Sequence, residues 1–508
     1  MNKSKMPIVL IGNNFKYEIE AVVKIFFPSG TRFEFIFEES TANFDKSAYN
    51  DYIIAYVIKK YSISLCAELK IDGCSEKMYY QLPHGSDKDT VEHELCRLIY
   101  TLLSLATDIY LPEGFSSFYS PWGLMTGIRP VKKVIELIRQ GKTRDEAEKI
   151  LEDKYILSPK KFRLAYETAV NQMPILEKIN KNAVSLYISI PFCPTRCSYC
   201  SFVSHSMDSA VKLIPEYIEK LCLEIEYLGN LVRETNTSID TIYFGGGTPT
   251  SLSAEQIKII MECVQKNFDL DNIREYSFEA GRPDTITEEK LRVIKAYGAD
   301  RISVNPQTLN DSVLKAIGRN HSSGEFFKAF ETARKIGFNN INTDLIAGLP
   351  TDTPDSFRNT LDKIIELNPE SITVHTLTLK RSSDLFANGV QNNLADEMID
   401  YSVETLVKND YFPYYLYRQK NTLDNLENVG YAKKGFESCY NIFIMDETQI
   451  IIGAGCSAST KMVYPDGKIS RIHNYKFPYE YIRNFDRLMD KKKELVECLK
   501  KISSLQQR

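Results

Sequence analysis

The sequence has no excess of charge of either sign. Its 508 residues hold 63 Lys and Arg against 67 Asp and Glu, a net charge of −4, so the basic surplus typical of nucleic-acid binders is missing. No run approaches the roughly 18 apolar residues of a membrane-spanning helix. Residues 1–7 are polar and lack the apolar segment of a signal peptide. We therefore expect a cytoplasmic protein with neither a nucleic-acid partner nor a membrane span.

Cysteine is too sparse for a disulfide scaffold, with 11 in the whole chain. Eight of the eleven are scattered, and we interpret most of these as small buried apolar side chains in a reducing compartment. The other three, Cys193, Cys197 and Cys200, stand close together in the sequence. We expect the cysteine chemistry of the chain at this triplet.

The length predicts roughly three domains of about 150 residues each, and 43% hydrophobic residues exclude a disordered chain. Residues 1–110 have the pattern of a small α/β unit, and residues 111–183 are mainly helical. Residues 184–384 alternate between short β-rich runs and helical stretches. We expect residues 385–508 to form an appendage on the sheet of this third region.

Six β-rich runs carry the alternation. They are Leu186–Phe192, Thr241–Gly247, Glu275–Gly281, Arg301–Gln307, Asn340–Gly348 and Ser371–Leu377. Each leaves room for one crossover helix, which predicts an α/β fold with a parallel sheet, either doubly wound or a partial barrel. Ligands of such sheets bind at the carboxyl ends of the strands. Two later runs, Tyr411–Arg418 and Gln449–Gly455, suggest added strands.

The cysteine triplet directly follows the first run, with the spacing C-x3-C-x2-C, and so lies on a loop at the carboxyl end of a strand. Three thiolates this close can hold three irons of a [4Fe–4S] cluster and leave the fourth iron open. A zinc ion is one alternative, with His205 as a fourth ligand, and unrelated core cysteines are another. We favour the cluster.

Polar groups and glycines end the following runs. Gly245–Gly247 and Thr248 end the second, and the three glycines let backbone approach a ligand with no Cβ in the way. Glu279, Gln307 and Asp344 end the third, fourth and fifth. Each alone could cap the next helix, but a polar group at four successive strand ends indicates a ligand site.

C-x3-C-x2-C after the first strand of a six-fold βα unit resembles the radical S-adenosylmethionine superfamily, and GGGTP resembles its motif for the methionine amino group. The resemblance implies a partial (β/α)6 barrel. It also implies that the amino and carboxylate groups of S-adenosylmethionine chelate the open iron. The reduced cluster then gives one electron to the sulfonium, which yields methionine and a 5′-deoxyadenosyl radical.

The runs LYISIPFCPTRCSYCSF, YFGGGTPT, RISVNPQT, DLIAGLP and IGAGCSAS resemble the oxygen-independent coproporphyrinogen III oxidase family over about residues 185–460. EAGRPDTI and the block Ser120–Pro130 resemble its HemZ-like branch. That block contains the single tryptophan, Trp122. We weigh two interpretations of it: packing of the extra domain against the sheet, and a wall or lid for the substrate.

Carried over position by position, the resemblance implies that Cys193, Cys197 and Cys200 hold the cluster. The positions that match contacts of one or two S-adenosylmethionine molecules are Tyr187, Tyr199, Gly246, Gly247, Thr248, Glu279, Gln307, Arg319 and Asp344. The implied reaction is oxidative decarboxylation of porphyrinogen propionates to vinyl groups in haem biosynthesis, with an electron donor such as flavodoxin or ferredoxin. Because such a tetrapyrrole substrate carries four carboxylates, its candidate contacts are Arg282, Arg381 and Arg418.

The sequence departs from the oxidases at two places. They have a histidine two residues after the first tyrosine, where this chain has Ser189, and Gly-Cys after the third cysteine, where it has Ser201-Phe202. The second departure is nearer to the Cys-Asp-Phe of the related haem-chaperone branch. Two rivals therefore stay open: a haem-trafficking protein with His375 or a cysteine as axial ligand, and a methyl-transferring relative that uses two S-adenosylmethionine molecules.

Overall fold

The computed structural model comprises two compact units. The first contains residues 1–128, 137–163 and 419–426, and the second contains residues 129–136, 164–418 and 427–508. The structure describes residues 5–27, 31–40, 43–59, 61–71, 73–110, 120–127, 129–200, 205–378, 394–419, 422–464 and 466–505. No helix within these ranges has both the length and the apolar character needed to cross a membrane.

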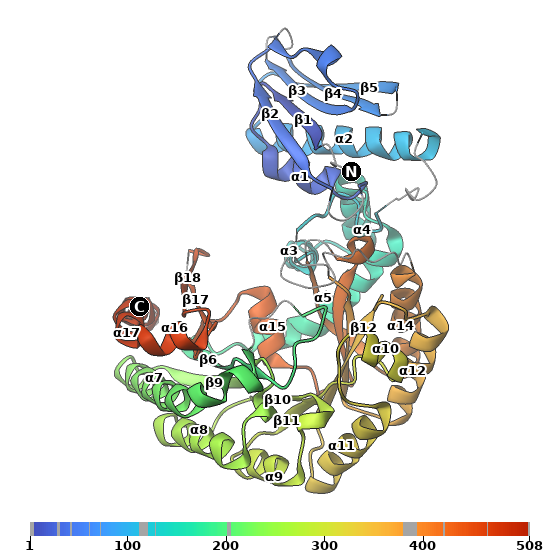
Figure 1. Ribbon diagram of the computed structural model, residues 1–508. Coiled ribbons are helices and arrows are strands. Elements are labelled where there is room, and N and C mark those ends of the chain that lie inside the picture. The colour runs from blue at the N-terminus through green and yellow to red at the C-terminus, as the bar shows by residue number, and fades with distance from the viewer. Residues whose placement is uncertain are drawn as a thin grey trace. The chain divides into compact units, whose positions relative to one another are not determined.

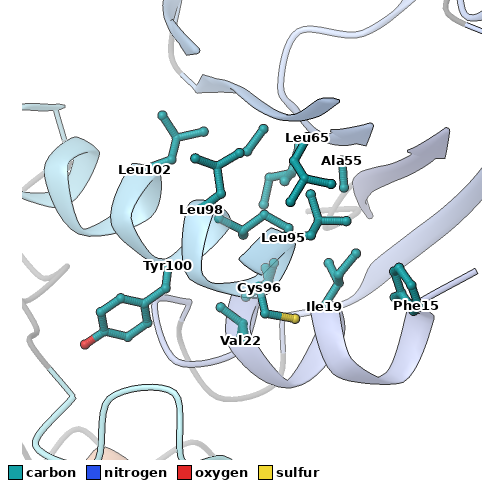
Figure 2. Close-up of a cluster of buried hydrophobic side chains, with 14 of the residues drawn as sticks. Phe15, Ile19, Val22, Ala55, Leu65, Leu95, Cys96, Leu98, Tyr100 and Leu102 are labelled. Carbon is teal, nitrogen blue, oxygen red and sulfur yellow. The ribbon is translucent and has the colours of Figure 1, made fainter. Parts of the chain in front are cut away.

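The first unit is built on a sheet of five strands in the order β2-β1-β3-β4-β5. The strands are β1 (Met6–Ile11), β2 (Phe33–Glu38), β3 (Tyr52–Lys59), β4 (Ile63–Ile71) and β5 (Cys74–Leu82). Helices α1 (Lys16–Val23) and α2 (Lys88–Tyr110) pack on one face of this sheet. Figure 2 shows the apolar core between them, where Leu95 and Leu98 of α2 meet Ala55 and Leu65 of the sheet.

Three helices follow in the chain: α3 (Val131–Arg139), α4 (Arg144–Tyr155) and α5 (Pro159–Glu177). The start of α4 is fixed by its sequence, because the Thr143 side chain accepts from the Glu146 backbone N–H and the Glu146 carboxylate accepts from that of Thr143. The predicted mainly helical character of this stretch is thus present. The four-part division of the chain stays a prediction.

Trp122 is fully buried in the first unit. Its block is pinned to the end of α4: the Leu124 N–H donates to the Tyr155 carbonyl over 2.7 Å, and the Ser158 N–H donates to the Pro121 carbonyl over 3.0 Å. Gly123 has φ +49°, and a Cβ there would lie 2.2 Å from the Tyr155 carbonyl oxygen. These contacts fix the backbone on both sides of Trp122, and the two interpretations of the tryptophan itself stay predictions.

The second unit has an eleven-stranded sheet in the order β14-β15-β13-β12-β11-β10-β9-β6-β16-β17-β18. Its six central strands are β6 (Ala183–Ile190), β9 (Ser238–Gly246), β10 (Glu275–Gly281), β11 (Arg301–Val304), β12 (Ile341–Ala347) and β13 (Ser371–Thr376). Neighbours among the six pair in parallel. The predicted α/β fold with its six-fold parallel core is confirmed.

Helices connect these strands and follow one another along the outer side of the sheet (Figure 1). They are α7 (Ile214–Glu234), α8 (Ala254–Asn267), α9 (Glu288–Ala296), α10 (Asp311–Ala316), α11 (Ser323–Ile336), α12 (Pro354–Glu366) and α14 (Ala395–Lys408). A short pair, β7 (Phe192–Cys193) with β8 (His205–Ser206), and helix α6 (Met207–Ala210) lie between β6 and α7.

The C-terminal residues extend the same sheet at both of its edges. Strands β14 (Phe412–Arg418) and β15 (Glu427–Ala432) join antiparallel beside β13, whereas β16 (Ile451–Ala454) pairs in parallel with β6. Strands β17 (Ser459–Val463) and β18 (Ile469–His473) complete that edge. The remaining helices are α15 (Cys439–Asp446), α16 (Pro478–Arg483) and α17 (Phe485–Leu505). The added strands predicted at residues 411–418 and 449–455 correspond to β14 and β16.

Candidate functional site

Several of the predicted site residues lie at the carboxyl ends of the parallel strands. Tyr187 and Ser189 on β6 pair in register with Tyr243 and Gly245 on β9. Glu279 on β10 stands beside Ser303 on β11. Because these strands run in parallel, the side chains that end them face a common region.

The cysteine loop, residues 193–200, is held directly against the glycine run. The Gly247 N–H donates to the Ile190 carbonyl over 2.8 Å, and the Thr248 N–H donates to the Phe192 carbonyl over 2.7 Å. The Thr248 hydroxyl donates to the Cys193 sulfur over 3.4 Å. A Cβ at Gly247 would lie 3.0 Å from that sulfur and 2.6 Å from the Phe192 oxygen, so only glycine allows this approach.

The three thiols of the loop differ in exposure. Cys197 is buried, and Cys193 and Cys200 are half-buried. Among the described residues, no group of three or more His, Cys, Asp or Glu side chains is arranged to hold a single metal ion, the triplet included. Thiolate ligands of a cubane cluster bind three different irons, so they need not converge on one point.

Gln307 has a strained backbone and an unpaired acceptor. Its φ is +66°, in the left-handed region that residues other than glycine seldom adopt. Its backbone bridges to β12, since the Gln307 N–H donates to the Asp344 carbonyl and the Ile346 N–H donates to the Gln307 carbonyl, each over 3.0 Å. The side-chain oxygen is buried with no hydrogen-bond partner among the described residues. A buried acceptor without a partner is costly, which indicates a ligand donor at this position.

The Glu279 carboxyl group contacts a tyrosine that belongs to a stack of tyrosine rings. Tyr243 stacks on Tyr440 of α15 with ring centroids 4.5 Å apart, and on Tyr187 with centroids 6.2 Å apart. The Tyr243 hydroxyl donates to the Glu279 carboxylate. Burial nevertheless raises the pKa of Glu279 to about 7. This carboxyl group can therefore exchange a proton near neutral pH.

Asp344 has the opposite shift. Its carboxylate accepts from the Asn342 amide over 2.7 Å, and one of its oxygens lies 3.9 Å from Nε2 of His375. Burial opposes the charge, but the nearby His375 and the hydrogen bond from Asn342 bring the pKa of Asp344 below its usual value. Two carboxyl groups at one edge of the sheet thus have different protonation behaviour, which is typical of a chemical site.

Arg319 lies at the cysteine loop. Its guanidinium donates to the Tyr199 hydroxyl over 3.3 Å and to the Asn305 carbonyl over 3.1 Å. The structure therefore brings Tyr199 and Arg319, two of the predicted S-adenosylmethionine contacts, together with the triplet.

Of the three arginines predicted for substrate carboxylates, two lie among the described residues. Arg282 is 3% exposed, and its guanidinium donates to Asp284 and Thr195. Arg418 is also buried, and burial lowers its pKa to about 10 in spite of the nearby Glu427. Arg381 lies outside the described residues. The Arg282 guanidinium thus has partners within the protein, and its predicted contact with substrate carboxylates stays a prediction.

Sequence reasoning missed Tyr243 and Thr195. Tyr243 stands two residues before Gly245 on β9, so the period-2 alternation of the strand places both on one face. That alternation was the signal that could have identified Tyr243. Thr195 lies between the first two cysteines, and only its long-range contacts give it a role.

Comparison with known proteins gives a family match and several similar proteins. Residues 187–364 match the Radical SAM superfamily. The chain is 38% identical over 460 residues, 88% of its length, to the oxygen-independent coproporphyrinogen-III oxidase-like protein HemZ of Bacillus subtilis, of which 90% is covered. It is 32% identical to the haem chaperone HemW of Bacillus subtilis, over 53% of this chain and 69% of HemW. Coproporphyrinogen III oxidase (HemN) from Escherichia coli, a solved radical SAM enzyme, is 23% identical with a TM-score of 0.49, over 63% of this chain and 72% of HemN.

The superfamily match assigns a [4Fe–4S] cluster and S-adenosylmethionine as the cofactors. The residues present fit both groups: the three thiols share one loop, where Gly247 lets backbone approach Cys193 closely, and the Gln307 oxygen lacks a protein donor among the described residues. The chain belongs to the radical S-adenosylmethionine superfamily and, within it, to the HemZ-like branch of the oxygen-independent coproporphyrinogen III oxidase family.

Proposed function

We propose that this protein oxidatively decarboxylates propionate side chains of a porphyrinogen to vinyl groups. The observation that carries the proposal is the contact of the cysteine loop with the glycine run, made by Cys193 against Gly247 and Thr248. This contact brings the cysteine loop and the glycine run together at the carboxyl ends of the parallel strands. The HemZ relative of this chain is named as oxidase-like. We further propose that the reaction takes place in the cytoplasm.

In this proposal, Cys193, Cys197 and Cys200 hold the cluster and leave one iron for S-adenosylmethionine. When bound, the cluster supplies one electron to the sulfonium and so generates the 5′-deoxyadenosyl radical. The protein's part is to position the cosubstrate and exclude water. The residues proposed for this are Tyr187, Tyr199, Gly246, Gly247, Thr248, Glu279, Gln307, Arg319 and Asp344.

Each group has a chemical reason to act there. The backbone of Gly246 and Gly247 can take the methionine amino group, and the orphaned Gln307 oxygen can accept from a ligand donor. Arg319 beside Tyr199 can pair with a carboxylate while the tyrosine ring lies near the adenine. Glu279 and Asp344 suit ribose hydroxyls or the ammonium group, both of which need acceptors.

The substrate reaction in this proposal begins with removal of a hydrogen atom. The radical removes a hydrogen atom from the β-carbon of a propionate, giving 5′-deoxyadenosine. The substrate radical then loses carbon dioxide and passes one electron to an external one-electron acceptor, and the vinyl group remains. A donor such as flavodoxin or ferredoxin would supply the electron for S-adenosylmethionine cleavage. Arg381 and Arg418 stay candidates for the substrate carboxylates.

The test is an anaerobic incubation of the reconstituted protein with coproporphyrinogen III, S-adenosylmethionine and a reductant. We expect monovinyl and divinyl products by mass, with one 5′-deoxyadenosine for each vinyl group. Release of 5′-deoxyadenosine without any vinyl product would retain the radical chemistry but reject this substrate.

A second candidate is a haem-trafficking role, supported by the 32% identity to the haem chaperone HemW. His375 is a candidate axial ligand of haem in this role. In the structure its Nδ1 lies 3.3 Å from the Tyr417 hydroxyl and its Nε2 lies 3.9 Å from Asp344. Stoichiometric haem binding without vinyl product, weakened in His375→Ala, would favour trafficking over catalysis.

A further inference from the structure

We propose that Arg282, held in place by Asp284, is a positioning residue that fixes the cysteine loop by binding Thr195. The inference rests on the proposed role of that loop as the holder of the cluster. It assigns the arginine a function inside the protein instead of a contact with substrate.

Arg282 divides its guanidinium between two partners. Nη1 donates to the Thr195 carbonyl over 3.1 Å and to the Thr195 hydroxyl over 2.8 Å. Nε and Nη2 donate to the two oxygens of Asp284 over 3.0 and 2.7 Å. The Arg282 side chain is almost fully buried, so loss of a partner would leave its charge uncompensated in the interior. We call these two residues the Arg282–Asp284 clamp.

Thr195 is the central point of the loop. It stands two residues after Cys193 and two before Cys197, so a displacement of Thr195 moves both thiols. The loop between them has no helix or strand to satisfy its backbone. Its polar groups therefore depend on distant partners, of which the Arg282 guanidinium is one.

The other side of the loop is fixed by the residues that follow α10. The Ser198 N–H donates to the Ile317 carbonyl over 3.0 Å. The Thr195 hydroxyl donates to the Gly318 carbonyl over 3.4 Å. Arg319 binds Tyr199 from the same segment. The Arg282–Asp284 clamp thus supplies the anchorage from β10, and the segment 317–319 supplies the anchorage from α10.

The geometry requires arginine specifically. A planar guanidinium can bind a carboxylate with one edge and a carbonyl and hydroxyl with another, whereas a lysine ammonium is a point charge on a flexible stem. Arg282→Lys therefore keeps the charge and removes the two-sided grip. It separates positioning from electrostatic attraction.

The same strand offers a matched control. Arg274, just before the start of β10, binds both oxygens of Asp240, with Nε donating over 2.6 Å to one of them. This pair lies at the amino end of β10, away from the cysteine loop at the carboxyl end. Arg274→Lys makes the same chemical change to a second two-oxygen Arg–Asp pair, in which the arginine is 29% exposed and the aspartate is buried.

The experiment reconstitutes wild type, Arg282→Lys, Asp284→Asn and Arg274→Lys anaerobically. It measures iron and sulfide per chain, the electron paramagnetic resonance spectrum of the reduced cluster, and the rate of iron loss to a ferrous chelator. We expect iron loss about tenfold faster or more in Arg282→Lys, a smaller acceleration in Asp284→Asn, and wild-type behaviour in Arg274→Lys. The apoproteins should unfold thermally like the Arg274→Lys apoprotein.

Iron loss from Arg282→Lys at the wild-type rate with an unchanged spectrum would overturn the proposal. So would an equal acceleration in Arg274→Lys, because the effect would then be general destabilisation. The readout needs no porphyrinogen. A wild-type protein that keeps its cluster but makes no vinyl product rejects the proposed function alone, whereas a stable cluster in Arg282→Lys rejects only the clamp.

Discussion

The sheets of the two units bury different side chains at alternate strand positions. In the first unit, the face under α2 is apolar, with Leu65 and Ala67 of β4 against Leu95. In the second unit, one set of alternate positions on the six central strands is mostly polar. Thr241 donates to Ser185 over 2.7 Å, and the fully buried Arg301 donates to Ser371 over 2.7 Å.

This difference separates stability from function. An apolar face gains from burial at roughly 25 cal/mol per Å² and needs no specific partners. A buried polar face contributes little net stability and must satisfy every group. Among the described residues, buried hydroxyls of this sheet such as those of Tyr276, Ser303 and Thr343 also lack a partner, and at its carboxyl edge the Gln307 oxygen is unpaired. The unsatisfied edge is where a ligand can add what the protein lacks.

Removing a cluster thiol is expected to have the largest effect. Cys197→Ala should reduce 5′-deoxyadenosine release to background, because two thiolates do not hold the cluster with one vacant iron. The apoprotein should keep its fold. Cys96→Ala, the same change at a buried cysteine of the first unit, should retain full release. Equal 5′-deoxyadenosine release by Cys197→Ala and wild type would show that Cys197 is not needed to hold the cluster.

Truncating the apolar core should affect stability alone. Leu95 is fully buried, so Leu95→Ala should cost about 2–5 kcal/mol of unfolding free energy in the first unit. Leu105 on the same helix is half exposed, and Leu105→Ala should change it by less than about 0.5 kcal/mol. Urea unfolding of both variants measures the difference. A lost cluster in folded Leu95→Ala would show that the two units are functionally coupled.

Glu279 should give the second unit a pH-dependent stability. Burial raises its pKa from 4.5 to about 7, so the folded state binds a proton that the unfolded state releases. The stabilisation is complete below pH 4.5 and is lost as pH rises through about 7. Relative to Glu279→Gln, wild type should lose at most about 3 kcal/mol between pH 4 and 8.

Paired urea unfolding of the two apoproteins measures this loss. The neighbouring Tyr243, Asp344 and His375 are present in both proteins, which differ only at residue 279. A pH-independent difference between wild type and Glu279→Gln would show that this carboxyl group titrates normally.

Close packing in the polar sheet should give a smaller effect. Gly430 on β15 pairs with Tyr415 on β14, and a Cβ at Gly430 would lie 1.8 Å from the tyrosine ring. Gly430→Ala should therefore cost about 1–3 kcal/mol. In a Tyr415→Ala background the same change should be nearly neutral, because the ring is gone. Thermal unfolding of the four proteins tests the pair, and additive costs would disprove the contact.

The sequence predicted the parts of the fold that local periodicity encodes. The six central strands and the polar group at each strand end follow from alternation and spacing. The partners of the C-terminal strands could not be predicted, because pairing of β16 with β6 joins residues far apart in the chain. Strand β15 was missed since Glu427, Asn428 and Gly430 break the apolar pattern of a buried strand.

Arg282 shows the same limit within the site. Its residue type predicted a carboxylate partner, and the structure provides one, but that partner is Asp284 two residues later. The R-P-D spacing contained this signal, whereas the bond to Thr195 depends on the fold. The predictions for the cluster thiols and for the S-adenosylmethionine contacts stay to be tested by experiment.

The most direct test of the central claim is spectroscopic. Anaerobically reconstituted wild type, reduced and measured by electron paramagnetic resonance with and without S-adenosylmethionine, should show a [4Fe–4S] signal that changes when the cosubstrate binds. Analysis should find about four irons and four sulfides per chain. Zinc at Cys193, Cys197 and Cys200, or a cluster signal insensitive to S-adenosylmethionine, would contradict the account.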